Sequence, residues 1–115
     1  MLQSRKAPIS ERLRLNFNTS LAERKPLPRT AAPAKQLSIG VTTLKRRLAE
    51  EGASVKSIKE RSRCELALSL LNDRHLTIGD IATHVGFSDA TAFRRAFKGW
   101  TGTSPHKYRL AIKPV

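Results

Sequence analysis

The chain has 115 residues, enough for one domain or two very small ones, so its core must be thin and its elements short. Twenty-two Lys and Arg against nine Asp and Glu give a formal net charge of +13. This excess favours a polyanionic partner, nucleic acid first and an acidic membrane second. The single cysteine, Cys64, excludes an intramolecular disulfide and a cysteine-based zinc site.

The first predicted helix follows a short N-terminal arm, residues 1–8. Ser10 is expected to cap this helix, which runs to about residue 24. Leu13, Phe17 and Leu21 recur every four residues and therefore share one face. The arm itself lacks the uninterrupted apolar segment of a signal peptide. Two prolines in "KPLPRT" then break the chain.

Two short helices are predicted between residues 30 and 52. The first begins near Thr30, because Pro33 is tolerated only in a first turn. The turn "SIG" follows, and "VTTLKRRLAEE" forms the second helix. Gly52 ends it, since glycine readily adopts the left-handed conformation after a helix C-terminus.

The second half of the chain begins with the longest predicted helix, about 54–72. Cys64 lies in it among apolar residues, so we expect a buried, inert thiol. Thr77 and Asp80 have the spacing of a capping box at the start of the next helix. A basic helix runs from Ser88 or Asp89 to about residue 100, and a last helix spans about 104–111 with Ser104 as its cap and Pro105 at its first position. No segment alternates with period two, so the fold is predicted to be all-α.

Two segments of the chain resemble one another. "AKQLSIGVTTLKRRL" (34–48) and "ATHVGFSDATAFRRAF" (82–97) each run from an alanine through an aliphatic and a small residue to a helix with consecutive basic residues. Their first residues are 82 − 34 = 48 positions apart. Each has the pattern of a helix-turn-helix unit, in which Ala34 and Ala82 allow the two helices to approach closely.

The second helix of each unit divides into an apolar and a polar face. Leu44 and Leu48, like Phe93 and Phe97, are four residues apart and point inward. The outward residues are long enough to reach base edges or phosphates, as a recognition helix requires. Those of the first unit are Thr42, Lys45 and Arg46, with Thr43 at the edge; those of the second are Ala90, Thr91, Arg94, Arg95 and Lys98. Two such faces in a chain of this charge predict binding to double-stranded DNA.

The segment "IGDIATHVGFSDATAFRRAFKGWTGTSPHKYR" (78–109) resembles the signature region of the AraC/XylS transcription regulators, and "GVTTLKRRLAEEG" (40–52) resembles their first helix-turn-helix. The resemblance extends over residues 9–110. It implies about seven helices forming two helix-turn-helix subdomains, about 30–52 and 77–100, joined by the long central helix, with residues 111–115 as a tail. It also implies that one recognition helix enters each of two successive major-groove segments.

Two residues depart from the family pattern. Gly40 stands where the family usually has a serine cap, which weakens that helix start by about a few tenths of a kcal/mol. Pro33 occupies a position that is usually apolar and helical, so we expect the first unit to be the less stable one. Most relatives carry an effector-binding or dimerisation domain upstream. A short stand-alone member and a truncated regulator lacking its effector domain therefore both remain open.

Within this hypothesis, Thr42, Lys45, Arg46, Thr91 and Arg95 are the predicted groove contacts, and Ala90 is placed for a thymine methyl. Thr43, Arg94 and Lys98 are candidates for phosphate contacts. Tyr108 is expected in the core, with His106, Lys107 and Arg109 towards the DNA backbone. The carboxylates expected to lie away from the DNA are Glu50, Glu51, Glu60 and Glu65.

Other function classes have weaker support. The chain has no metal-ligand spacing or phosphate-binding glycine loop, so no catalytic residue, metal or cofactor is predicted, and His84 is expected to be a surface residue. The alternative is a non-specific basic protein that binds RNA or DNA, but single-strand binders expose stacking aromatics, and the aromatic residues here fall on inward faces. No helix is suited to a membrane. The expectation is a monomeric, cytoplasmic, nucleoid-associated regulator with RNA polymerase as a candidate partner.

Overall fold

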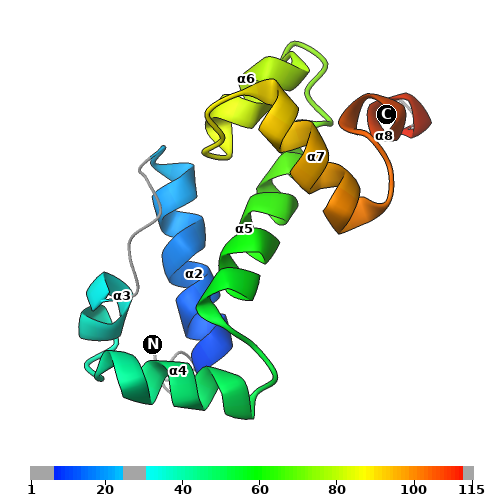
Figure 1. Ribbon diagram of the computed structural model, residues 1–115. Helices are drawn as coiled ribbons and strands as arrows, with labels where there is room; N and C mark the ends of the chain where they lie inside the picture. Colours follow the sequence, from blue (N-terminus) through cyan, green and yellow to red (C-terminus); the bar gives the residue numbers. More distant parts are fainter. Residues whose placement is uncertain (1–6, 25–30, 113–115) are drawn as a thin grey trace. The chain divides into compact units, whose positions relative to one another are not determined.

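The computed structural model describes residues 7–24 and 31–112, and within these ranges the chain forms seven helices and no strand (Figure 1). The predicted all-α class is therefore confirmed. The helices are α2 (Ile9–Ala22), α3 (Ala31–Gln36), α4 (Val41–Glu50), α5 (Val55–Leu70), α6 (Ile78–His84), α7 (Ala90–Thr101) and α8 (Pro105–Ala111). None of them is long and apolar enough to cross a bilayer. Most of the predicted arm and the start of the third segment near Thr30 lie outside the described residues.

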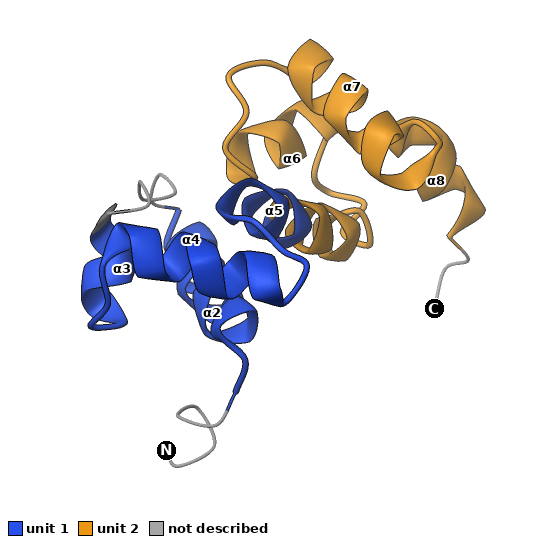
Figure 2. Ribbon diagram, turned by 60° about the horizontal axis from the view of Figure 1, so that its bottom comes forward, with its two compact units in different colours: residues 1–62 blue, residues 63–115 orange. Residues whose placement is uncertain are grey.

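The helices form two compact units, residues 1–62 and 63–115, coloured separately in Figure 2. The boundary falls inside α5, between Ser62 and Arg63, so this helix contributes its first half to one unit and its second half to the other. Each unit has its own hydrophobic core, and the two cores share no residue. The predicted central helix is thus present, two residues shorter at its C-terminal end than expected.

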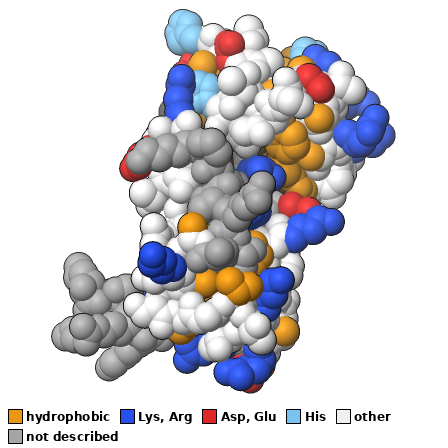
Figure 3. Space-filling model, turned by 60° about the vertical axis from the view of Figure 1, so that its left-hand side comes forward, with side chains coloured by type: hydrophobic (Ala, Val, Ile, Leu, Met, Phe, Trp, Pro, Cys, Tyr) orange, Lys and Arg blue, Asp and Glu red, His pale blue; other side chains and the backbone are white. Residues whose placement is uncertain are grey.

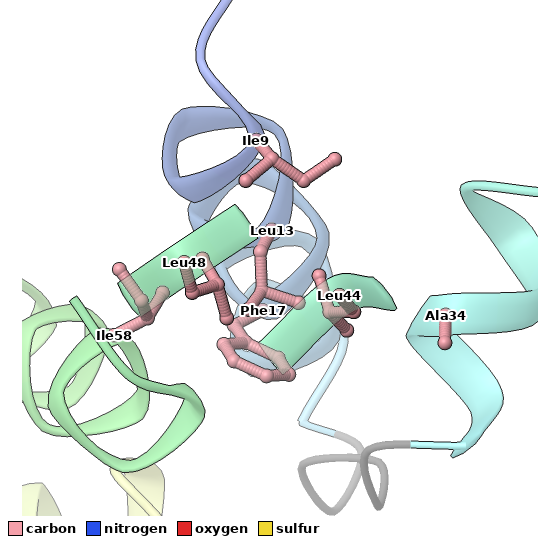
Figure 4. Close-up of a cluster of buried hydrophobic side chains, with 7 residues drawn as sticks. All are labelled: Ile9, Leu13, Phe17, Ala34, Leu44, Leu48 and Ile58. Carbon is pink, nitrogen blue, oxygen red and sulfur yellow. The ribbon is translucent and has the colours of Figure 1, made fainter. Parts of the chain in front are cut away.

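The core of unit 1 is formed where α2 meets α4 (Figure 4). Leu13 and Phe17 from α2 point towards Leu44 and Leu48 from α4, and all four side chains are fully buried. Ile58 of α5 lies at one side of this group. Leu21 is buried as well, which confirms that the four-residue spacing along α2 marks its inner face.

The start of α2 differs from the prediction. Its N-cap is Pro8, which has no side-chain donor or acceptor, and Ser10 lies inside the first turn rather than at the cap. Glu51, which follows α4, caps the helix instead: its carboxylate accepts the backbone N–H groups of Ile9 at 2.9 Å and Ser10 at 3.1 Å, and the Ser10 hydroxyl. A carboxylate from 41 residues away therefore satisfies donors that a helix N-terminus leaves free.

Glu51 is expected to make a measurable contribution to the stability of unit 1. Although partial burial raises the pKa of its carboxyl group, the hydrogen bonds from Ser10 and Ile9 lower it further, to below the ordinary 4.5. Glu51→Ala should reduce the free energy of unfolding by about 1 kcal/mol, as loss of a helix cap does. Because the folded-state pKa is lowered, this contribution is present above about pH 4.5 and is lost as the pH falls through the lowered value.

The test is chemical denaturation followed by far-UV circular dichroism, together with hydrogen exchange at the first amides of α2. Glu50→Ala is the matched control, because Glu50 is the neighbouring exposed carboxylate. If the two variants lost the same stability, or if the loss in Glu51→Ala persisted unchanged in acid, the cap would not be the cause.

The two helix-turn-helix turns have the same backbone hydrogen bonds. In unit 1 the amide of Ile39 bonds to the carbonyl of Ala34 at 3.0 Å, and in unit 2 Phe87 bonds to Ala82 at 2.9 Å. Ser38 has a φ of 61°, at the position where unit 2 has Gly86 with a φ of 89°. A serine in this left-handed region is strained where a glycine is not. The predicted repeat is therefore a structural one, and the first turn carries more strain than the second.

Unit 2 is built around aromatic side chains. Phe93 and Phe97 of α7 are fully buried, and the ring of Phe97 lies 5.7 Å from the ring of Tyr108 on α8 and 6.4 Å from that of Trp100. Phe87 and Trp100 pack partly buried against the same cluster. The prediction that the aromatic residues serve the core rather than base stacking is confirmed for these five.

The predicted helix ends in unit 2 are largely confirmed. Thr77 and Asp80 form a reciprocal capping box, whose hydrogen bonds lower the pKa of Asp80. Ser104 caps α8, and Pro105 occupies its first turn. Of the two proposed start residues for α7, Asp89 is the cap, and its carboxylate accepts the amide of Ala92 at 2.7 Å.

Candidate nucleic-acid interface

The outward face of α4 is opposite the pair of leucines buried in unit 1. Thr42, Lys45 and Arg46 are exposed, and Thr43 is half-buried at the edge of this face. One residue of an α-helix turns the chain by about 100°, so Arg46 lies about 200° from Leu44 and faces solvent most directly. The predicted separation of apolar and polar faces is therefore present.

The outward face of α7 has the same construction. Thr91, Arg94, Arg95 and Lys98 are exposed, whereas Ala90 is half-buried beside the core. Arg95 lies about 200° round the helix from Phe93, and Arg94 lies at the flank, about 100° from it. Arg95 is thus the arginine of α7 best placed to meet a surface lying against this helix.

The repeat changes register by one residue at the second helix of each unit. The first helices and turns are 48 residues apart, but the N-caps Gly40 and Asp89 are 89 − 40 = 49 residues apart. The second turn therefore contains one more residue than the first, which a single offset of 48 does not describe. With this correction the equivalent outward pairs are Thr42 with Thr91, Lys45 with Arg94, and Arg46 with Arg95.

The corrected register shows a difference between the two faces that the sequence analysis missed. Glu50 lies one turn after Arg46 on the outward face of α4 and is exposed, contrary to the expectation that it lies away from the contact residues. Its equivalent in unit 2 is Gly99, and the equivalent of Ala49 is Lys98. The face of α7 is thus the more positive of the two. Aligning the two buried pairs, Leu44–Leu48 with Phe93–Phe97, is the sequence signal that would have revealed this.

The N-termini of the two helices also differ. Asp89 places a carboxylate on the first amides of α7, whereas Gly40 offers α4 no side-chain cap. A carboxylate already occupies the end of α7 that would attract a phosphate. Contacts of α7 with an anionic partner must then come from its side chains.

Arg109 has a structural role that the sequence did not indicate. Its guanidinium donates hydrogen bonds to the backbone carbonyls of Leu71 at 3.2 Å and Asp73 at 3.1 Å. It thereby ties α8 to the residues that follow α5 within unit 2. His106 and Lys107, by contrast, are exposed on α8. A phosphate contact by Arg109, predicted from the sequence, would have to share donors with these carbonyls.

The remaining chemically distinctive residues show no arrangement for catalysis. Cys64 is half-buried rather than buried, and burial, followed by the nearby Glu65 carboxylate, raises the pKa of its thiol, which disfavours the reactive thiolate. His84 is half-buried in the last turn of α6. Among residues 7–24 and 31–112, no three His, Cys, Asp or Glu side chains are grouped as metal ligands would be.

Positive charge is not confined to the two outward faces. Lys and Arg side chains lie at several separate places on the surface drawn in Figure 3, where Asp and Glu are fewer. Exposed cations outside α4 and α7 include Lys35, Lys56 and Arg74. A polyanion would therefore gain attraction from much of the surface, in addition to any contact with α4 and α7.

Comparison with known proteins gives consistent results. Residues 34–111 match the model of a helix-turn-helix domain. The chain is 35% identical over 82 residues to the HTH-type transcriptional regulator VqsM of Pseudomonas aeruginosa, a match covering 71% of this chain and 25% of that protein. It spans 22–25% of the length of the curated relatives with the strongest matches.

Two solved structures have a similar fold. A DNA-binding transcriptional dual regulator from Escherichia coli K-12 superposes with a TM-score of 0.84 at 23% identity, covering 92% of this chain and 99% of that one. The transcriptional regulator CdpR from Pseudomonas aeruginosa has a TM-score of 0.74 at 35% identity, covering 86% of this chain and 32% of CdpR. The arrangement of helices is thus the one these two proteins have.

Proposed function

Because the chain belongs to the AraC/XylS family of helix-turn-helix, DNA-binding transcription regulators, we propose that it binds double-stranded DNA sequence-specifically through α4 and α7. The observation that carries this proposal is the pair of outward faces, each exposed and basic and each opposite two buried apolar residues. A recognition helix needs this construction, because one side must anchor it while the other meets base edges. No catalytic step is proposed.

The proposed binding mode uses one chain for two half-sites. Each recognition helix enters its own major-groove segment, so the site is expected to have two halves about one helical turn, or ~10 bp, apart. The halves should differ in sequence, because Thr42, Lys45 and Arg46 do not match Thr91, Arg94 and Arg95 in full. We expect the first half to be the less constrained. Pro33, Gly40, the strained Ser38 and the acidic Glu50 all lie in unit 1.

Selection of bound sequences from random duplex DNA, followed by footprinting at stoichiometric protein, tests this proposal. The expected result is an asymmetric, bipartite site protected by one chain. A palindrome occupied by two chains would refute the monomeric mode, and one short protected segment would mean that only one unit binds. Equal affinity for all duplexes, or tighter binding to single-stranded RNA, would instead favour a non-specific nucleic-acid protein.

Arg95 and Lys98 should separate base recognition from phosphate binding. If Arg95 contacts a guanine, Arg95→Ala should cost about 1–3 kcal/mol on the selected site and relax the preference at one base pair. Lys98→Ala should weaken binding to all sequences alike. Fluorescence anisotropy on selected and random duplexes measures both effects, with Lys56→Ala as a control that removes one exposed charge from α5. Equal losses of Arg95→Ala on the two duplexes would remove Arg95 from the base contacts.

A cytoplasmic, nucleoid-associated location follows from duplex DNA as the ligand and belongs to the same proposal. RNA polymerase as a partner and the monomeric state remain predictions. Gel filtration of the free chain and of its DNA complex would check the second.

A further inference from the structure

Arg63, the first residue of unit 2, holds its charge in an unusual setting. The side chain is half-buried on α5, and its Nε atom is buried with no hydrogen-bond partner among the described residues. Burying a charged donor without a partner costs free energy. The guanidinium carbon lies 5.6 Å from the centre of the Phe87 ring, and a cation facing an aromatic ring recovers part of that cost.

Phe87 connects this arginine to the second recognition helix. It is the turn residue whose amide bonds to Ala82, and its ring lies 5.6 Å from that of Phe93 and 5.9 Å from that of Trp100, both on α7. The path from Arg63 to α7 therefore passes through one side chain. A change in the position of Phe87 would be transmitted to both ends of the inner face of α7.

Arg63 also lies against the glycine that makes the turn possible. A Cβ atom added to Gly86 would be 3.9 Å from Arg63 Nε, an ordinary contact distance. The φ of 89° at Gly86 is the left-handed conformation on which the angle between α6 and α7 depends. The guanidinium is therefore in contact range of both consecutive residues of the turn.

Unit 1 does not share this arrangement. The residue equivalent to Phe87 is Ile39, which offers no ring to a cation, and Ser38 stands at the position of Gly86. The cation of α5 that faces an aromatic ring in unit 1 is Lys59, and its partner is Phe17 of α2 rather than a turn residue. The contact between α5 and a helix-turn-helix turn is thus a feature of unit 2.

We infer that Arg63 is a positioning residue for the second recognition helix: through Phe87 it fixes the orientation in which α7 presents its outward face, without touching DNA itself. The inference rests on the proposed function of α7. It differs from the direct contacts proposed for that helix, because the side chain acts from another helix and on the inner side of the turn.

The test compares Arg63→Met with Lys56→Met, a variant of an exposed lysine on the same helix that removes the same charge. On the selected duplex Arg63→Met should bind about fivefold more weakly, and on random duplex it should match Lys56→Met. The slope of log affinity against log salt should equal that of Lys56→Met. Arg63→Lys and Phe87→Tyr keep a cation and a ring and should bind within about twofold of the parent chain, whereas Phe87→Leu should resemble Arg63→Met.

The double variant Arg63→Met/Phe87→Leu should bind no more weakly than the worse single variant, since both changes break one contact. Additive losses would overturn the inference. A salt slope reduced by about 0.9 relative to Lys56→Met would also overturn it, because Arg63 would then be a phosphate ligand. If Arg63→Met does not fold, the comparison of Arg63→Lys, Phe87→Tyr and Phe87→Leu carries the same test.

A measurement without DNA separates this inference from the proposed function. In the free protein, Arg63→Met should speed hydrogen exchange at the amides of Phe87 and Ala92, which lie in the turn and at the start of α7. Unchanged exchange would overturn the inference even if the parent chain binds DNA. Faster exchange in a chain that binds no specific duplex would support the positioning of α7 and refute the proposed function.

Discussion

Affinity for the selected duplex should fall about a thousandfold or more between about 50 and about 200 mM salt, if roughly six phosphates are contacted. Each phosphate neutralised by Lys or Arg releases counterions, so log affinity should decline with log salt by about 0.9 per contact. The formal charge of +13 and the exposed Arg94 and Lys98 on α7 are the basis for this expectation. Fluorescence anisotropy across a salt series measures the slope.

Two variants make the salt experiment specific. Lys98→Ala should reduce the slope by about 0.9, because one phosphate contact is lost. Leu110→Ala, a change on α8 that removes no charge, should leave the slope unchanged. An affinity that barely responds to salt in the parent chain would contradict a charge-driven interaction with nucleic acid.

Phe97→Ala should lower the free energy of unfolding of unit 2 by about 3–5 kcal/mol. The side chain is fully buried, and its ring lies within 6.4 Å of those of Phe93, Trp100 and Tyr108, so removing it leaves a cavity lined by aromatic rings. Small domains are stable by only about 5–15 kcal/mol, so this change removes a large part of the total.

The chain offers a convenient probe for this prediction. Trp100 is its only tryptophan and lies in unit 2, so fluorescence during denaturation reports this unit. Leu110→Ala is the control, because Leu110 is 69% exposed and its truncation should change the stability by less than about 0.5 kcal/mol. A loss below about 1 kcal/mol in Phe97→Ala would mean that the aromatic cluster is not the core of unit 2.

The parts of the fold predicted correctly from the sequence depend on local patterns. The capping box of Thr77 and Asp80, the Ser104–Pro105 start of α8 and the buried face of α2 each follow from residues within one or two turns. The exposed residues of α4 and α7 follow from the same periodicity. Their exposure is now established, whereas their contacts with DNA remain predictions.

The features that the sequence did not predict join residues far apart in the chain. Glu51 caps α2 across 41 residues, Arg109 bonds to carbonyls up to 38 residues away, and Arg63 faces a ring 24 residues on. No local periodicity records such pairs, because they depend on how the helices pack. The error at Ser10 has the same origin: a serine near a helix start is a frequent cap, but here a distant carboxylate takes that role.

The separation of the two hydrophobic cores has a consequence for how the protein is made. Every core residue of unit 1 precedes Lys59, and every core residue of unit 2 follows Glu65. Ribosomes add about 5–20 residues per second, so synthesis of the second half takes several seconds, whereas small helical domains fold in microseconds to milliseconds. We therefore expect folding to proceed from the N-terminus: the first helix-turn-helix closes while the second is still being translated, and α5 is completed last as an extension of a structure already formed.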